Sequence, residues 1–245
     1  MNLYTEINNR VSNGEKMWAI LIDPDKTSYK ELPKLAALIN NSSCDYVLIG
    51  GSLINDVEFD QYILFLQQKL SKKIILFPGD NTQISSHADG ILLLSLISGR
   101  NPDLLIGQHV KSSLRLKKSK LCIMPTGYIL IDGGNLSSVQ YVSNTLPIPS
   151  NNFDIATATA LAGEQLGMKF IYLDAGSGAN FPVNTQMIQS IKKHVSVPIF
   201  TGGGIKNQEQ LENSWKAGAD IVVIGNAIEK NNSLIQLLNN YSRCN

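Results

Sequence analysis

Eight short apolar runs, separated by longer amphipathic stretches, constrain the fold of this 245-residue chain more than any other feature. Most of the runs are continuously apolar, which is typical of parallel strands covered on both faces. The segments between them favour helices; Val183, Met187 and Ile191, for example, fall on one helical face. Such alternation indicates βαβ units. The predicted strands are Met17–Ile22, Tyr46–Ile49, Lys73–Phe77, Gly90–Leu94, Leu121–Pro125, Phe170–Asp174, Pro198–Thr201 and Asp220–Ile224.

Eight strands in one α/β chain predict a closed (β/α)8 TIM barrel, and the length is close to the ~250 residues of that fold. An open, doubly wound sheet is the alternative. No linker rich in Pro, Gly or Ser divides the chain, so we expect one domain spanning residues 1–245. The longest irregular stretch is 132–152. A loop of that length is usually a lid, a binding loop or an interface, although a tolerated surface insertion explains it equally well.

The composition indicates which binding partners and which cell compartment fit this chain. Lys and Arg number 21 against 20 Asp and Glu, and this balance argues against a nucleic-acid-binding protein. The three cysteines are scattered, without metal-ligand spacing, which favours a reducing cytoplasm. Residues 1–16 do not resemble a signal peptide, and no apolar run reaches the ~20 residues of a membrane span. For the three histidines we expect surface or capping roles, because no catalytic arrangement includes them.

Glycines follow the last two predicted strands, at Thr201–Gly204 and Ile224–Asn226. In a barrel, the active site lies in the loops after the strands, and the loops after strands seven and eight commonly bind phosphate. Glycines let successive backbone N–H groups approach an anion closely. The alternative, a flexible turn, becomes weaker because the two loops occur as a pair. Gly176–Gly178, after strand six, is a candidate third side of the same cradle.

Asp23 and Ser52 follow strands one and two and are the candidate metal ligands. A carboxylate beside a hydroxyl suits Mg²⁺, which takes one or two protein oxygens and completes its shell with water and phosphate. Asp23 could equally cap the turn that contains Pro24, a frequent role of Asp. Asp25 is a weaker candidate ligand, and Lys26 could neutralise a phosphate or pair with Asp25.

Asp174, at the end of strand six, is the candidate catalytic residue. A carboxylate at this position could act as a general base or stabilise positive charge. The alternative is a buried hydrogen bond that organises the loop. Tyr128 and Ile129–Ile131 could line a groove or belong to the core.

Six motifs, in order along nearly the whole chain, resemble those of the geranylgeranylglyceryl phosphate synthases. They are Leu21–Lys26, Ile49–Ser52, Pro125–Tyr128, Tyr172–Ala179, Thr201–Ile205 and Ile224–Ala227. The resemblance implies a Mg²⁺-dependent prenyltransferase that joins sn-glycerol 1-phosphate to geranylgeranyl diphosphate and releases pyrophosphate, a step towards ether phospholipids. The regions 125–134 and 140–143 resemble the longer, archaeal-type group, which implies the geranylgeranyl chain, a homo-oligomer (dimer or hexamer) and transient membrane contact for the lipid product.

By this resemblance Asp23 and Ser52 bind the metal and Asp174 is catalytic. The residues implied in glycerol phosphate binding are Tyr172, Leu173, Asp174, Ala175, Gly176, Ser177, Gly178, Gly203, Gly204, Gly225 and Asn226. One departure is that the family commonly has Glu where this chain has Asp174, one methylene shorter. The rival hypotheses are a heptaprenyl-specific version of the reaction, a phosphosugar isomerase or synthase, and a non-catalytic barrel that binds a phosphorylated ligand.

Overall fold

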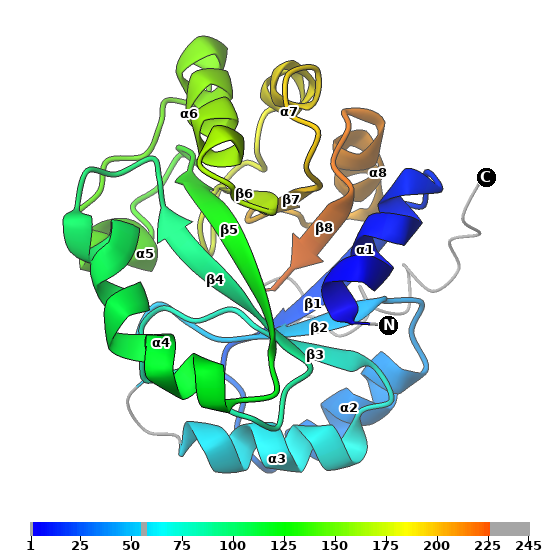
Figure 1. Ribbon diagram of the computed structural model, residues 1–245. Helices are drawn as coiled ribbons and strands as arrows, with labels where there is room; N and C mark the ends of the chain where they lie inside the picture. The colour runs from blue at the N-terminus through cyan, green and yellow to red at the C-terminus, as the bar shows by residue number, and fades with distance from the viewer. Residues whose placement is uncertain (1, 55–57, 226–245) are drawn as a thin grey trace.

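The computed structural model describes residues 2–54 and 58–225 of the chain, and its eight parallel strands close into a barrel (Figure 1). Each strand pairs with its neighbours in sequence, and β1 pairs with β8 to close the ring, with Met17 opposite Ile221. The predicted TIM barrel is therefore confirmed. The strands are β1 Met17–Ile22, β2 Tyr46–Ile49, β3 Lys73–Leu76, β4 Gly90–Leu96, β5 Cys122–Leu130, β6 Phe170–Asp174, β7 Ile199–Gly202 and β8 Ile221–Ile224.

Helices surround the barrel (Figure 1). They are α1 Leu3–Ser12, α2 Leu32–Asn40, α3 Phe59–Lys69, the π-helical turn η1 Asp103–Gly107, α4 Gln108–Lys118, α5 Ser138–Ser143, α6 Phe153–Gln165, α7 Thr185–Lys192 and α8 Gln208–Lys216. Several begin at an asparagine whose side chain accepts a backbone N–H of the first turn, as Asn152, Asn184 and Asn207 do for α6, α7 and α8. Among the described residues, no helix is long and apolar enough to cross a membrane.

Two apolar layers hold the barrel together. The inner layer fills the barrel with large rings such as Tyr46, Phe170 and Phe200, while the outer layer lies between strands and helices. Helix α1 closes the N-terminal end of the barrel, because its Leu3 and Ile7 are buried in the inner layer. With that end closed, the loops at the opposite end provide the entrance.

Strand β5 is longer than predicted, since it continues past Pro125 to Leu130. A proline normally interrupts a sheet because it lacks an N–H. The Pro125 carbonyl accepts the N–H of Lys169, the residue before β6 begins. The side of Pro125 that faces the neighbouring strand therefore lies beside residues that precede β6. The missing donor therefore costs no ladder hydrogen bond, and Tyr128 lies within the strand rather than in a loop after it.

The connection from β3 to β4, residues 77–89, contains no helix. Its sequence explains this, because Pro78 and Gly79 interrupt helical periodicity directly after the strand. Gln83, which is buried, organises the segment instead: its side chain bonds the N–H groups of Gly51 and Gly79 and the Gly51 carbonyl. The connection between β3 and β4 consequently contributes no helix to the outer face of the barrel.

The long segment 132–152 has structure of its own. It contains α5, and Ile131 forms a parallel bridge with Ile148 that returns the segment to the barrel. Residues of this segment, from Leu136 to Ser143, line the cavity described next, so it forms a wall of the entrance rather than a surface insertion.

Candidate active site

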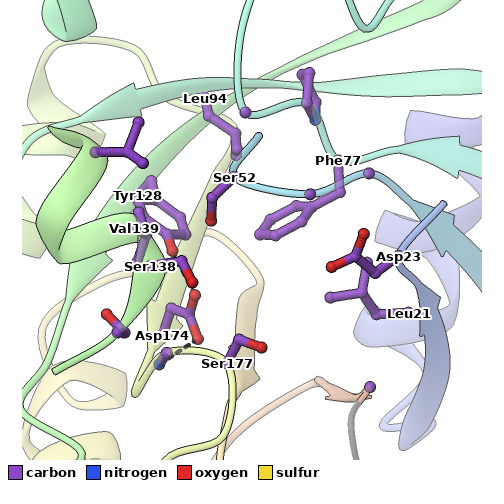
Figure 2. Close-up of a pocket in the computed structure, with 18 of the residues that line it drawn as sticks. Leu21, Asp23, Ser52, Phe77, Leu94, Tyr128, Ser138, Val139, Asp174 and Ser177 are labelled. Atoms are coloured by element: carbon purple, nitrogen blue, oxygen red, sulfur yellow. Dashed lines mark hydrogen bonds between the residues drawn. The ribbon is translucent and has the colours of Figure 1, made fainter. Parts of the chain in front are cut away.

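A cavity of about 1100 Å³ opens at the C-terminal ends of the strands. Figure 2 shows Leu21 and Asp23 on one side of it and Tyr128, Asp174 and Ser138 on the other. One end of the cavity is lined by the glycine loops after β6, β7 and β8, and the other by apolar side chains of β4 and α4. The two ends therefore offer surfaces of different chemistry.

The glycine loops after β6 and β7 are in direct contact. Gly203 has a φ of +81°, and a β-carbon there would lie 2.7 Å from both the nitrogen and the oxygen of Gly176. At Gly204, with a φ of +72°, a β-carbon would lie 2.4 Å from the Phe181 carbonyl oxygen. The N–H of Ala175 also donates to the Gly202 carbonyl, at 3.0 Å. Only glycine fits such close backbone contacts, and the loops form a concavity suited to an anion.

The structure brings most of the predicted phosphate-site residues together. Those that line the cavity are Tyr172, Asp174, Gly176, Ser177, Gly178, Gly203, Gly204 and Gly225. Leu173 instead packs in the outer apolar layer. Ala175 is buried, and its backbone N–H donates to the Gly202 carbonyl. Asn226 lies outside the described residues.

Asp23 has two partners at the end of β1. Its Oδ1 accepts the N–H of Asp25 at 3.2 Å, so the predicted turn-capping role is present. Its Oδ2 lies 2.8 Å from the Lys26 ammonium, so Lys26 pairs with Asp23. The carboxylate lies over Gly51, where a β-carbon would be 2.9 Å from Oδ1, and Ser52 follows at the rim of the cavity. The small residue at 51 makes room for the carboxylate beside the β2 loop.

The donor set at Asp23 and Ser52 fits a hard divalent cation. Both groups offer oxygen, and Mg²⁺ binds through one or two carboxylates plus substrate phosphates. Within residues 2–54 and 58–225, no group of three or more His, Cys, Asp or Glu side chains could hold a metal. Mg²⁺ at this position would complete its shell with water and with oxygens of a bound phosphate.

Asp174 is buried where the two ends of the cavity meet. Its Oδ2 accepts the hydroxyl of Tyr128 and its Oδ1 accepts the N–H of Gly176 at 2.8 Å. Burial raises the pKa of Asp174, while the two donors lower it. Burial also raises the pKa of Tyr128 well above its ordinary value, so the phenol stays protonated and donates. Asp174 thus organises its loop and is also a stronger base than an exposed aspartate.

The apolar end begins with aromatic rings and continues outward. Phe77, Tyr128 and Tyr172 contact one another, with ring centroids between 4.9 and 6.0 Å apart. Beyond them the cavity reaches the outer layer beside the helix-free connection 77–89, where the lining residues are Ile84, Ile91, Leu93, Gln108, His109, Ser112 and Leu116. The absent helix leaves the space that this part of the cavity occupies.

Comparison with known proteins decides the family. The model of the PcrB family matches residues 10–240. The chain belongs to the PcrB family. Its relatives include the geranylgeranylglyceryl phosphate synthase of Chitinophaga pinensis, 48% identical over 96% of this chain and 93% of the relative. The synthase of Pyrococcus furiosus is 39% identical over 90% and 87%. The resemblance seen in the motifs is therefore confirmed.

Solved structures agree with this PcrB assignment. The geranylgeranylglyceryl phosphate synthase of Thermoplasma acidophilum, determined in complex with its substrate sn-glycerol-1-phosphate, superimposes with a TM-score of 0.91 at 29% identity. The superposition covers 98% of this chain and 96% of that one. The enzyme of Thermoplasma volcanium gives a TM-score of 0.90 at 32% identity over the same shares.

Two residues of this PcrB-family site could not be predicted from the sequence. Gln83 clamps the loops after β2 and β3, and a glutamine in an irregular segment carries no local signal of that role. His109, expected at the surface, is half-buried and lines the cavity, with Nε2 3.1 Å from Ser95 Oγ. Burial lowers the pKa of His109, which keeps its ring uncharged at the apolar end.

Proposed function

We propose that this protein is a geranylgeranylglyceryl phosphate synthase, which joins geranylgeranyl diphosphate to the 3-hydroxyl of sn-glycerol 1-phosphate and releases pyrophosphate. One observation carries the proposal: a single cavity combines a backbone cradle for phosphate with an apolar extension beyond Asp174. A polar phosphate ester and a long hydrocarbon tail are the two substrates that such a cavity suits. Relatives of that name, one of them 48% identical to this chain, support the same conclusion.

A phosphosugar enzyme is a poorer fit to this cavity. Small-molecule pockets occupy roughly 300–1,000 Å³, and a sugar phosphate needs only a small, polar part of that range. The cavity here is about 1100 Å³, and leucines and isoleucines line its far end. The buried Asp174, with its raised pKa, also favours an enzyme over a non-catalytic binding protein.

The reaction breaks the bond between C1 of the prenyl chain and the diphosphate oxygen, which leaves with the bonding electrons. The glycerol 3-hydroxyl oxygen then bonds to C1 and loses its proton. In the proposed arrangement the glycine loops hold the glycerol phosphate and thereby place the hydroxyl near Asp174. Asp174 accepts the proton or stabilises the positive charge at C1. Phe77 and Tyr128 also line the cavity, and aromatic rings favour positive charge through their quadrupoles.

We further propose that Asp23 and Ser52 hold Mg²⁺ when the diphosphate binds. The cation would supply charge stabilisation for the departing pyrophosphate. What supports this is the oxygen-only donor set and the room that Gly51 leaves for the carboxylate.

We also propose that the protein is a cytoplasmic homo-oligomer. Large apolar side chains are exposed in and around α5, with Tyr141 at 80% and Leu146 at 82% exposure. Several large apolar side chains exposed in one segment are typical of an interaction site. Leu146→Ser, which lies outside the cavity lining, should lower the mass measured by analytical ultracentrifugation and leave turnover intact. An unchanged mass would place the interface elsewhere.

The activity is tested by pyrophosphate release. Purified protein is mixed with sn-glycerol 1-phosphate, Mg²⁺ and either geranylgeranyl or heptaprenyl diphosphate. We expect release with geranylgeranyl diphosphate, and slower release with the longer chain. Release that is faster with heptaprenyl diphosphate would support the heptaprenyl alternative, and no release with either would contradict the proposed function. EDTA should abolish the reaction if Mg²⁺ is required.

A further inference from the structure

Lys26 lies between the two parts of the site that bind charged groups. The turn after β1 folds back, with the Lys26 N–H donating to the Asp23 carbonyl at 3.1 Å. This brings the Lys26 ammonium to 2.8 Å from Asp23 Oδ2 and 3.4 Å from Ser177 Oγ. Asp23 belongs to the candidate metal site, and Ser177 belongs to the glycine loop after β6. One ammonium group therefore touches both.

Cations are few around this cavity. In the described part of the chain, the lysines that line it are Lys26 and Lys206. The Lys206 ammonium donates to the Asn180 carbonyl at 2.9 Å and has no acidic partner in the described residues. Two phosphorylated substrates would bring several negative charges to the cavity, so the position of each ammonium matters. Of the two, only Lys26 pairs with a carboxylate there.

The ion pair between Lys26 and Asp23 is easily broken. The Lys26 side chain is 45% exposed, and ion pairs of exposed lysines contribute little to stability because water screens them. The lysine side chain is also long and flexible, with a compact charge that several acceptors can share. The ammonium already lies 3.4 Å from Ser177 Oγ, so loss of the Asp23 contact would leave it at the glycine loop. A divalent cation at Asp23 would repel the ammonium and cause that loss.

We infer that Lys26 couples the metal site to the glycerol phosphate site. Without a divalent cation, Lys26 is held by Asp23; when the cation binds Asp23, the ammonium is released to the phosphate at the Ser177 loop. The inference rests on the proposed function, since it takes glycerol phosphate as the ligand of the glycine loops. Its consequence is that metal and glycerol phosphate increase each other's affinity by the same factor, as thermodynamic linkage requires.

The experiment measures binding of sn-glycerol 1-phosphate by isothermal titration calorimetry, in EDTA and in Mg²⁺, with no prenyl substrate present. In the wild type, Mg²⁺ should increase the affinity roughly fivefold or more. Asp23→Asn removes the carboxylate that holds Lys26, so it should bind more tightly than the wild type in EDTA and gain nothing from Mg²⁺. Lys26→Gln should lose most of the Mg²⁺ effect. In the double variant, the gain from Asp23→Asn should disappear.

Lys206→Gln is the matched control, because it removes the other ammonium of the cavity without touching Asp23. It should weaken binding of glycerol 1-phosphate and keep the Mg²⁺ effect. An equal loss of the Mg²⁺ effect in both lysine variants, or an undiminished effect in Lys26→Gln, would overturn the inference.

These results are separate from the test of function. Binding with the expected coupling but without pyrophosphate release would contradict the proposed reaction and support the role of Lys26. Pyrophosphate release without the coupling would support the proposed reaction and contradict the role of Lys26. If the wild type fails to bind glycerol 1-phosphate, both are contradicted.

Discussion

The two ends of the cavity are built in different ways. At the phosphate end, the backbone forms the surface, and Gly203 is pressed so closely against Gly176 that no side chain fits. At the tail end, side chains such as Leu93 and Leu116 form the surface, beside a connection that has no helix. A backbone surface tolerates almost no substitution, whereas a side-chain surface can change size one residue at a time. The chemistry should therefore be sensitive to the first end, and the choice of prenyl chain to the second.

Asp174, where the two ends meet, should show the largest effect. Asp174→Asn removes a carboxylate that accepts a proton or stabilises charge, and we expect turnover to fall by about 10²–10⁴-fold. Steady-state pyrophosphate release measures this. Asp174→Glu, which restores the acid that the family commonly has, should keep much of the activity. Equal losses in both variants would show that Asp174 serves packing rather than chemistry.

Gly203→Ala tests the backbone end. Its β-carbon would collide with Gly176, so the cradle must open and kcat/KM for glycerol 1-phosphate should fall by about 10²–10³-fold, comparable to losing one well-placed donor. Gly14→Ala is the matched control, because Gly14 has nearly the same φ, +78°, with no atom within 4 Å of a β-carbon. Both variants carry a similar backbone strain of about 1–2 kcal/mol. Should Gly14→Ala lose as much activity, the effect is general destabilisation.

Leu93→Trp tests the tail end by filling the outer part of the cavity. If the last isoprene unit can no longer be buried, the loss at about 0.8 kcal/mol per carbon approaches 4 kcal/mol, which predicts at least 10²-fold lower kcat/KM for geranylgeranyl diphosphate. Geranyl diphosphate, a shorter substrate, should be affected far less. Competition between the two substrates in one assay gives the ratio directly. A parallel loss for both chain lengths would place the tail elsewhere.

Tyr128→Phe should have the smallest effect, and it appears mainly in the pH profile. The Tyr128 hydroxyl lowers the pKa of Asp174, which burial raises. Removing that donor raises the pKa of Asp174 further, so the carboxylate is protonated at a higher pH. The acidic limb of kcat against pH should therefore move to higher pH, with about tenfold or less loss at the optimum. A limb that stays in place would mean that Asp174 does not control it.

Sequence reasoning succeeded where local chemistry decides the structure. Continuous apolar runs located every strand, and glycines whose φ values are positive marked the backbone cradle. It failed where distant residues decide. Pro125 is tolerated because it lies beside residues that precede β6, and Gln83 matters because two loops meet beside it. Neither contact can be predicted from the neighbouring residues in the sequence. The tail end likewise combines side chains of β4, α4 and the connection 77–89, which are far apart in the sequence, so local patterns do not predict it.

The helix-free connection has a further consequence. Strands β3 and β4 pair at two positions, whereas β4 and β5 pair at seven. This seam has the fewest paired residues of the eight in the barrel, and it lies away from the glycine loops. Substitutions at Ile84, in the outer part of this connection, could reshape the tail compartment while the glycine loops keep their geometry, whereas Phe77 and Gln83 of the same connection belong to the site itself. The barrel thus separates a wall made of side chains, which can change size, from a wall made of backbone, and one scaffold could accept new hydrophobic substrates with its glycine loops unchanged.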